Sequence, residues 1–162
     1  MAARLTRSDK EVFHNCIQEL LKNPSIHEMK KYIQHSDIST FRHCLRVAKK
    51  SLLLARSLKL DVDREALIRG AMLHDYFLYD WHTQGDHLHG YHHPHIASKN
   101  ASRDFNLNEK EKNIIESHMW PLTLFHLPKS KEAALVCIAD KLCSAGEVTR
   151  WVTKLKRIPR TD

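Results

Sequence analysis

Residues 67–81 read LIRGAMLHDYFLYDW and predict a buried helix that ends at an adjacent polar pair, His74 and Asp75. Apolar residues recur at helical spacing on a face that passes through His74, and the small residues Gly70 and Ala71 allow close contact with another helix. An unpaired carboxylate in such a place costs several kcal/mol, and it also opposes the dipole at a helix C-terminus. We therefore expect an Arg, a Lys or a metal ion beside Asp75.

The composition predicts one globular, helix-rich domain. The chain has 162 residues, of which 42% are hydrophobic and 28% are charged, with only 4 Gly and 5 Pro, and it contains no visible internal repeat. Helical periodicity is present almost everywhere, whereas we find no convincing strand-like alternation. We predict an all-α fold, namely a compact single-domain bundle of about six to eight helices.

Apolar periodicity and capping signals place these helices along the chain. The expected segments are about residues 8–22, 25–34, 40–60, 63–75, 94–105, 108–120 and 130–151 or a little beyond. The expected N-caps are Ser8, Ser39 or Thr40, Asp61 or Asp63, and Asn108, with Glu11 and Glu111 completing capping boxes. Pro94 is expected at the first position of its helix, because the missing N–H is tolerated there.

Histidine is concentrated in the middle of the chain. The chain contains 13 His, and residues 81–95 read WHTQGDHLHGYHHPH. Residues 80–91 have no period and are predicted to form a loop of the kind that carries function or acts as a lid. The histidines of this segment could line a substrate mouth, shuttle protons or only coat the loop: His82, His87, His89 and His92. For His82 we expect the last of these roles.

Polar residues at core positions of other helices suggest a metal site. Asp140 lies inside the apolar segment AALVCIADKLC, where it either faces the same cation as Asp75 or pairs with a neighbouring Arg or Lys. His43 and His118 lie near the core faces of two further helices, and His93 lies at the start of another. A single histidine of this kind is more often a packed core residue. Together with the His-Asp pair, however, the set is a normal way to build a metal site in a helical bundle.

The ligand types narrow the choice of metal. Imidazole and carboxylate suit Fe, Mn, Ni, Co or Zn, whereas the four cysteines lack metal-ligand spacing, are interpreted as buried thiols and argue against a structural zinc site. The whole set is large enough for two ions that share a bridging carboxylate, and one ion could be held by four of them: His43, His74, Asp75 and Asp140. A divalent ion lowers the pKa of bound water and polarises a phosphoryl oxygen, which are the two needs of phosphate ester hydrolysis.

The order H…HD…H…H…D resembles the HD-domain superfamily of metal-dependent phosphohydrolases, which is named after the adjacent His-Asp pair. The matching segments lie within about residues 36–147 and read FRHCLRVA, GAMLHDYF, HHP, SHMWP and IADKLCS. The resemblance implies a first metal bound by His43, His74, Asp75 and Asp140, and a second site completed by His93 and His118. Of His92 and His93, the residue directly before Pro94 fits the family pattern better.

The resemblance also implies an activity. The expected reaction is hydrolysis of a phosphate ester of a nucleotide or other small phosphorylated metabolite, by phosphomonoesterase or phosphodiesterase chemistry with a metal-activated water. The expected catalytic residues are Asp75 and Lys141, the second by holding phosphate. Other basic groups that could neutralise the developing charge are Arg42, Arg46 and Lys49.

The same resemblance suggests how the chain is organised. Residues 36–147 are expected to form the metal-binding core, residues 1–35 to be helices packed on it, and residues 148–162 to be the end of the last helix and a basic tail of the same structural domain. No run of residues resembles a signal peptide or a membrane span, so we expect a cytoplasmic protein without a membrane partner.

Two other functions compete with hydrolysis. Some HD-like proteins oxidise substrates with a di-iron pair, and a regulatory or nucleic-acid-binding helical module could use the net charge of +7. We do not expect nucleic acid as a partner, because Lys and Arg are spread along the chain and the set of candidate ligands is intact.

Overall fold

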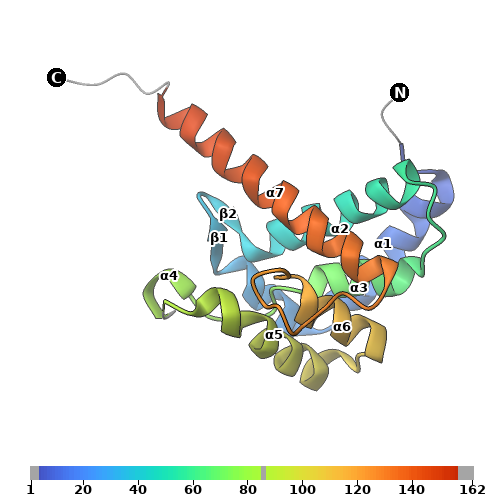
Figure 1. Cartoon of the computed structure of the whole chain (residues 1–162), viewed down its shortest axis with the longest axis horizontal. Coiled ribbons are helices and arrows are strands. Elements are labelled where there is room, and N and C mark those ends of the chain that lie inside the picture. Colours follow the sequence, from blue (N-terminus) through green and yellow to red (C-terminus); the bar gives the residue numbers. More distant parts are fainter. Residues whose placement is uncertain (1–3, 85–86, 157–162) are drawn as a thin grey trace.

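The structure is a computed structural model that describes residues 4–84 and 87–156, and its architecture is helical (Figure 1). The helices are α1 (Arg7–Leu21), the 3-10 helix η1 (Pro24–Lys30), α2 (Thr40–Ser57), α3 (Arg64–Leu73), α4 (Trp81–Gln84), α5 (His89–Phe105), α6 (Glu109–Ser117) and α7 (Lys131–Lys156). One small antiparallel hairpin joins β1 (Ile33–His35) to β2 (Ile38–Ser39). The prediction of an all-α bundle is confirmed, and the hairpin is an addition to it.

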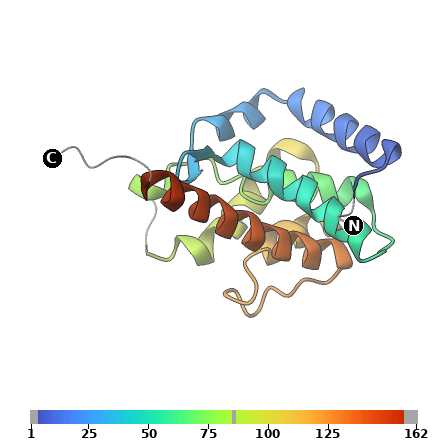
Figure 2. The same cartoon turned by 90° about the horizontal axis from the view of Figure 1, so that it is seen from above.

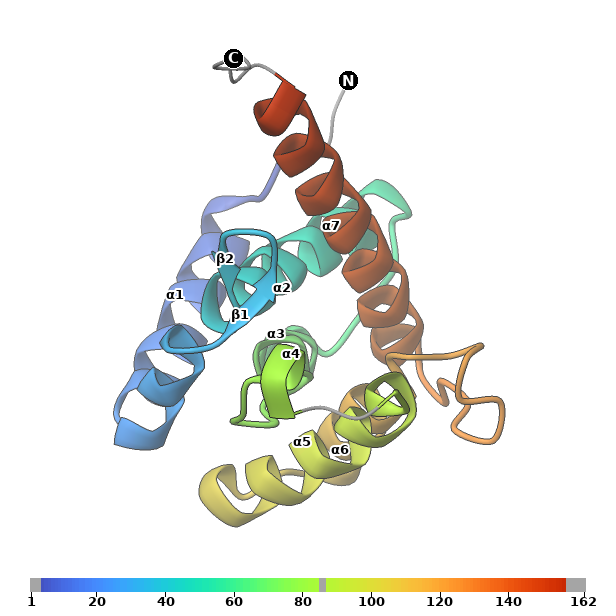
Figure 3. The same ribbon diagram turned by 90° about the vertical axis from the view of Figure 1, so that its left-hand side faces the viewer.

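Helix α3 is the centre of the bundle. It contacts α1 and α2 on one side and α5, α6 and α7 elsewhere, and Figure 3 shows α5 and α6 on the side of α3 away from α2. Its inner surface is buried, as the apolar pattern predicts. At Gly70 a Cβ atom would lie only 2.7 Å from Cγ2 of Ile114 in α6. The prediction of close helix contact at Gly70 is therefore correct, and this contact fixes the distance between the C-terminal ends of α3 and α6.

Local capping signals predict three helix starts correctly. The side chains of Ser39 and Asp63 cap α2 and α3, and Asn108 forms the predicted capping box with Glu111 at the start of α6. The prediction for α1 is wrong by two residues. Its capping box consists of Thr6 and Asp9 rather than Ser8 and Glu11, because Asp9 also pairs with arginines of α2 and α3.

The predicted helix over residues 25–34 is wrong in its second half. The 3-10 helix ends at Lys30, and the chain then forms the hairpin, with Ser36 in the left-handed region at φ 60°. The backbone N–H of Thr40 donates to the carbonyl of Tyr32 at 2.9 Å. The side-chain amide of Gln34 donates a hydrogen bond to the carboxylate of Asp75. Tertiary contacts thus replace a short stretch of helical periodicity.

The predicted loop over residues 80–91 is partly helical. It contains α4, and α5 begins at His89, so that Pro94 lies inside α5 and not at its first position. Proline removes one helical hydrogen bond. The turn before it is nevertheless supported, because the rings of His89 and His93 stack with their centroids 4.6 Å apart. The Nδ1–H of His93 also donates to the carbonyl of His89 at 2.9 Å.

Helix α7 completes the bundle and extends beyond it. In Figures 2 and 3 α2 lies between α1 and α7, and Figure 1 shows the C-terminal part of α7 projecting past the hairpin. None of the helices within residues 4–84 and 87–156 combines the length and the hydrophobicity needed to cross a membrane. The division at residues 35/36 and 147/148 and the cytoplasmic location stay predictions.

Candidate metal centre

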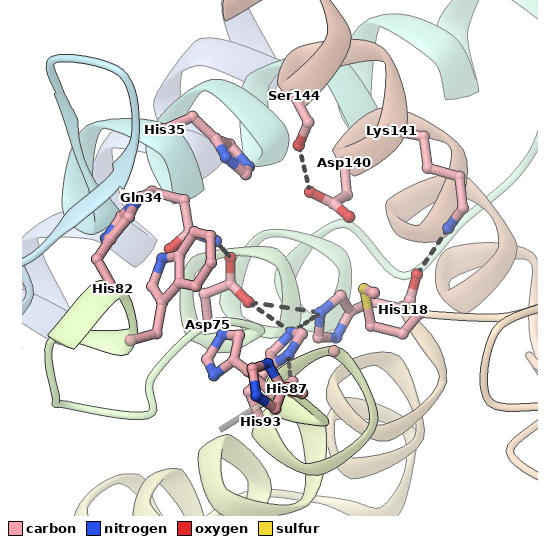
Figure 4. Close-up of a pocket in the computed structure, with 14 residues that line it drawn as sticks. Gln34, His35, Asp75, His82, His87, His93, His118, Asp140, Lys141 and Ser144 are labelled. Atoms are coloured by element: carbon pink, nitrogen blue, oxygen red, sulfur yellow. Dashed lines mark hydrogen bonds and ion pairs between the residues drawn. The ribbon is translucent and has the colours of Figure 1, made fainter. Parts of the chain in front are cut away.

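The ends and turns of five elements bring the predicted residues to one place, and Figure 4 shows four of them, Asp75, His93, His118 and Asp140. His43 is the fourth residue of α2, His74 and His118 are the C-caps of α3 and α6, and Asp75 follows α3 directly. His93 comes from the first turns of α5 and Asp140 from the middle of α7. The six are 0–7% exposed: His43, His74, Asp75, His93, His118 and Asp140. His93 rather than His92 points inward, since His92 is exposed.

The carboxylate of Asp75 lies between two groups of imidazoles. Its Oδ2 atom is 3.2 Å from Nε2 of His74 and 3.8 Å from Nε2 of His43. Its Oδ1 atom is 3.2 Å from Nε2 of His93 and 3.4 Å from Nε2 of His118. We call His43, His74 and Asp140 with Oδ2 the first half of the centre, and His93 and His118 with Oδ1 the second half.

Donor atoms within each half are close enough to share one ion. In the first half, Oδ1 of Asp140 is 3.0 Å from Nε2 of His43 and 3.7 Å from Nε2 of His74. In the second half, the Nε2 atoms of His93 and His118 are 2.8 Å apart. Two nitrogens bound at right angles to one ion, each at about 2.1 Å, would be about 3.0 Å apart. The spacing in both halves therefore fits metal ligation.

The outer nitrogen of every imidazole is already engaged, so that Nε2 faces the centre. Three histidines donate from Nδ1 to main-chain carbonyls of the preceding turn: His74 to Ala71 at 2.7 Å, His93 to His89 at 2.9 Å and His118 to Ile115 at 2.6 Å. His43 donates from Nδ1 to Oε2 of Glu147 at 3.0 Å. Such outer hydrogen bonds set the tautomer that a metal requires.

Two buried atoms at the middle of the centre lack a hydrogen-bond partner. They are Nε2 of His74 and Oδ1 of Asp75, and among the described residues no Lys or Arg nitrogen lies within 4.0 Å of either Asp75 or Asp140. Leaving such a group unsatisfied costs about 1–3 kcal/mol. Of the three cations expected beside Asp75, the described residues supply neither Arg nor Lys, so the donor set fits a metal ion.

The pKa shifts within the centre also fit a site for a cation. Burial alone would lower the pKa of His43, but the carboxylates of Asp140 and Glu147 raise it to about 10. Burial alone would raise the pKa of Asp75, but the surrounding imidazoles hold it well below its usual value. Protons thus neutralise these carboxylates when no cation does. In the second half, burial lowers the pKa of His118, which stays a neutral donor.

Sequence reasoning missed several residues of the centre. Gln34 donates from Nε2 to Oδ2 of Asp75 at 2.7 Å, and Ser144 donates to Oδ1 of Asp140 at 3.3 Å. The thiol of Cys44 is buried, as expected, and it lies close enough to His74 and Asp75 for the three to share an ion, which the spacing of the cysteines did not indicate. No local signal marks Gln34, whereas Ser144 lies one turn beyond Asp140 and could have been found by helical spacing.

A cavity of about 750 Å³ opens onto the centre. Beside the proposed ligands it is lined by Gln34, His35, Trp81, His82, His87, His89, Gly90, Met119, Lys141 and Ser144. His82 therefore lines the cavity, although we expected it only to coat a loop. Among the four basic candidates Lys141 lines the cavity, and its Nζ donates to the carbonyl of His118 at 3.0 Å. Arg46 instead contacts Glu147.

A comparison with known families agrees with this geometry. The family model described as HD domain matches residues 40–145, which is more than half of the chain. The chain belongs to the HD-domain family. HD domains are a family of metal-dependent hydrolases, and the match covers all six of the converging residues and nearly the whole range expected from the sequence. No curated protein and no solved structure gives a match.

Proposed function

We propose that the protein hydrolyses a phosphate ester of a nucleotide or another small phosphorylated metabolite, with water activated by two divalent transition metal ions. The observation that carries this proposal is the position of Asp75, whose two carboxylate oxygens face two separate groups of donors. A carboxylate shared in this way is a normal bridge between two ions in a helical bundle.

The first ion would be held by His43, His74, Asp75 and Asp140, and the second by Asp75, His93 and His118. Fe, Mn, Ni, Co and Zn all suit imidazole and carboxylate donors. When bound, a divalent ion supplies Lewis acidity toward a phosphoryl oxygen and lowers the pKa of a water molecule. Asp75 orients both sites relative to each other, which is the catalytic role that we assign to it.

The cavity supports a small anionic substrate. Its volume of about 750 Å³ lies in the range of small-molecule sites. Apart from the proposed ligands Asp75 and Asp140, its described lining contains no acidic side chain, whereas it includes Lys141 and several histidines. A wall of this composition attracts anions. We assign to Lys141 the role of holding the phosphate, for which its ammonium would leave the carbonyl of His118.

The test is metal analysis followed by a substrate screen. Protein purified without chelators should contain a transition metal and release phosphate from members of a panel of nucleotides and sugar phosphates. His74→Ala and Asp75→Ala should lose this activity. Bound metal without turnover of any phosphate ester would contradict the hydrolase and favour oxidation by a di-iron pair. Salt-sensitive RNA or DNA binding that survives both substitutions would instead favour a regulatory module.

A further inference from the structure

His43 differs from the other three histidines of the centre in what its outer nitrogen contacts. The others donate to main-chain carbonyls, whereas His43 donates to the carboxylate of Glu147 in α7, with Nδ1 and Oε2 3.0 Å apart. The side chain of Glu147 is 2% exposed. The pair joins residues 104 positions apart in the sequence, so it is a tertiary contact and not a by-product of one helix.

His43 also differs from His74 and His118 in its position within its helix. His74 and His118 cap the C-terminal ends of their helices, where main-chain carbonyls lack helical partners. His43 is the fourth residue of α2, and the free main-chain groups at that end of a helix are N–H donors. At this position the acceptor for Nδ1 of His43 is the carboxylate of Glu147 in α7.

Glu147 is itself held in place. Nη1 of Arg46 donates to its Oε1 atom at 3.0 Å, and Arg46 lies one turn after His43 on α2. The carboxylate is therefore fixed between two side chains of α2. Glu147 also lies two turns after Asp140 on α7. One helix thus provides both a ligand of the first half and the group that orients the histidine opposite to it.

We propose that Glu147 is a positioning residue that keeps the proton of His43 on Nδ1, so that Nε2 is free to bind the ion of the first half. The proposal rests on the proposed metal centre. It predicts that Glu147 determines the affinity of the first half and leaves the second half unchanged, since outer carboxylates of this kind are worth about 10–100-fold in metal affinity.

The experiment measures Co²⁺ binding by titration and by the absorption spectrum of the ligated ion. In the wild type and in a His118→Ala background, which keeps only the first half intact, Glu147→Ala should weaken Co²⁺ binding by about 10–100-fold. Glu147→Gln keeps the shape and an acceptor oxygen but not the charge. Its affinity for Co²⁺ should therefore lie between that of the protein with Glu147 and that of Glu147→Ala. Because Glu147→Gln is nearly isosteric, it also serves if Glu147→Ala does not fold.

The matched control is Glu111→Gln. Glu111 is 3% exposed and pairs with Arg69, with Oε1 and Nε 2.6 Å apart, but it lies outside the centre. This substitution should lower thermal stability and leave Co²⁺ affinity and spectrum unchanged. If Glu147→Ala and Glu147→Gln bind Co²⁺ as the wild type does, or if Glu111→Gln weakens binding equally, the positioning role is refuted. A wild type that binds no Co²⁺ would instead refute the metal centre itself.

Discussion

The two halves of the centre share Asp75 but differ in charge. The first half adds the carboxylate of Asp140 and has Glu147 directly behind His43. The second half adds only the imidazoles of His93 and His118, whose outer nitrogens contact neutral carbonyls. Since negative charge close to a site strengthens its hold on a cation, the halves should bind unequally. The first half should fill first and empty last.

Removing the shared residue should have the largest effect. Asp75→Ala takes one donor from each half, so both ions should be lost and hydrolysis should fall by about 10³-fold or more. Metal content and phosphate release measure the two effects. Asp80→Ala is the matched control, because Asp80 lies five residues further on with a side chain that is 40% exposed. Retention of both ions in Asp75→Ala would show that this residue is not the bridge.

Two variants that each lose one ligand, one in the first half and one in the second, test directly whether the halves differ in metal affinity. His118→Ala and His74→Ala should each retain a single ion per chain, and the ion in His118→Ala should be bound at least about tenfold more tightly. Both histidines are C-caps of similar burial, which makes them a matched pair. Equal affinities would remove the distinction between the halves.

The halves should also respond differently to pH. An ion entering the first half displaces a proton from His43, whose pKa in the metal-free protein is about 10. Displacement of this proton alone should raise the apparent affinity of the first half by up to about tenfold per pH unit from pH 6.5 toward 10. His74, whose pKa is also raised by neighbouring carboxylates, should add to this rise. The pKa of His118 is lowered, so this ligand of the second half has no such proton to displace at neutral pH. Titrations of His118→Ala and His43→Ala at several pH values separate the two behaviours.

The raised pKa of His43 also makes the stability of the metal-free protein depend on pH. The pKa of His43 is higher in the folded protein than in the unfolded chain, so protonated His43 contributes to the free energy of unfolding. This contribution is complete below pH 6.5, the usual pKa of histidine, and is lost as the pH rises to about 10. Thermal unfolding of the metal-free protein should therefore occur at lower temperature across this range. The metal-loaded protein should lack this part of the dependence, because the ion and not a proton neutralises the carboxylates.

The smallest effects should come from the scaffold that separates the halves. Gly70→Ala forces a methyl group against Ile114, where α3 and α6 carry His74 and His118, and should destabilise the fold by about 1–3 kcal/mol. Gly146→Ala in α7 meets no atom within 4 Å and should stabilise the fold by up to about 1 kcal/mol. Chemical denaturation measures both. Effects of the same sign would contradict the close contact at Gly70.

The sequence predicts those parts of the molecule that depend on local signals. The caps Ser39, Asp63 and Asn108 are correct because the side chain of each accepts from a main-chain N–H only three residues further on. The start of α5 is missed because Leu88 offers no side-chain cap and the histidine-rich segment has no apolar period. The hairpin is missed because its strands are held by contacts with distant residues.

In the metal centre, too, the residues marked by a local signal are predicted and those held by long-range contacts are missed. Its six histidines and aspartates stand out because they are polar residues at apolar helix positions, and the structure brings all six together. Glu147 does not stand out, since a glutamate near Arg150 and Lys154 in a long helix resembles a solvated charge. Its burial becomes visible only when α2 packs against α7. Long-range pairing of this kind cannot be read from a single chain segment.

The most direct measurement is an anomalous difference map from crystals grown with Mn²⁺. The account predicts two peaks on opposite sides of Asp75, a stronger one among His43, His74 and Asp140 and a weaker one beside His93 and His118. A map without a peak at ligand distance from Asp75 would contradict it.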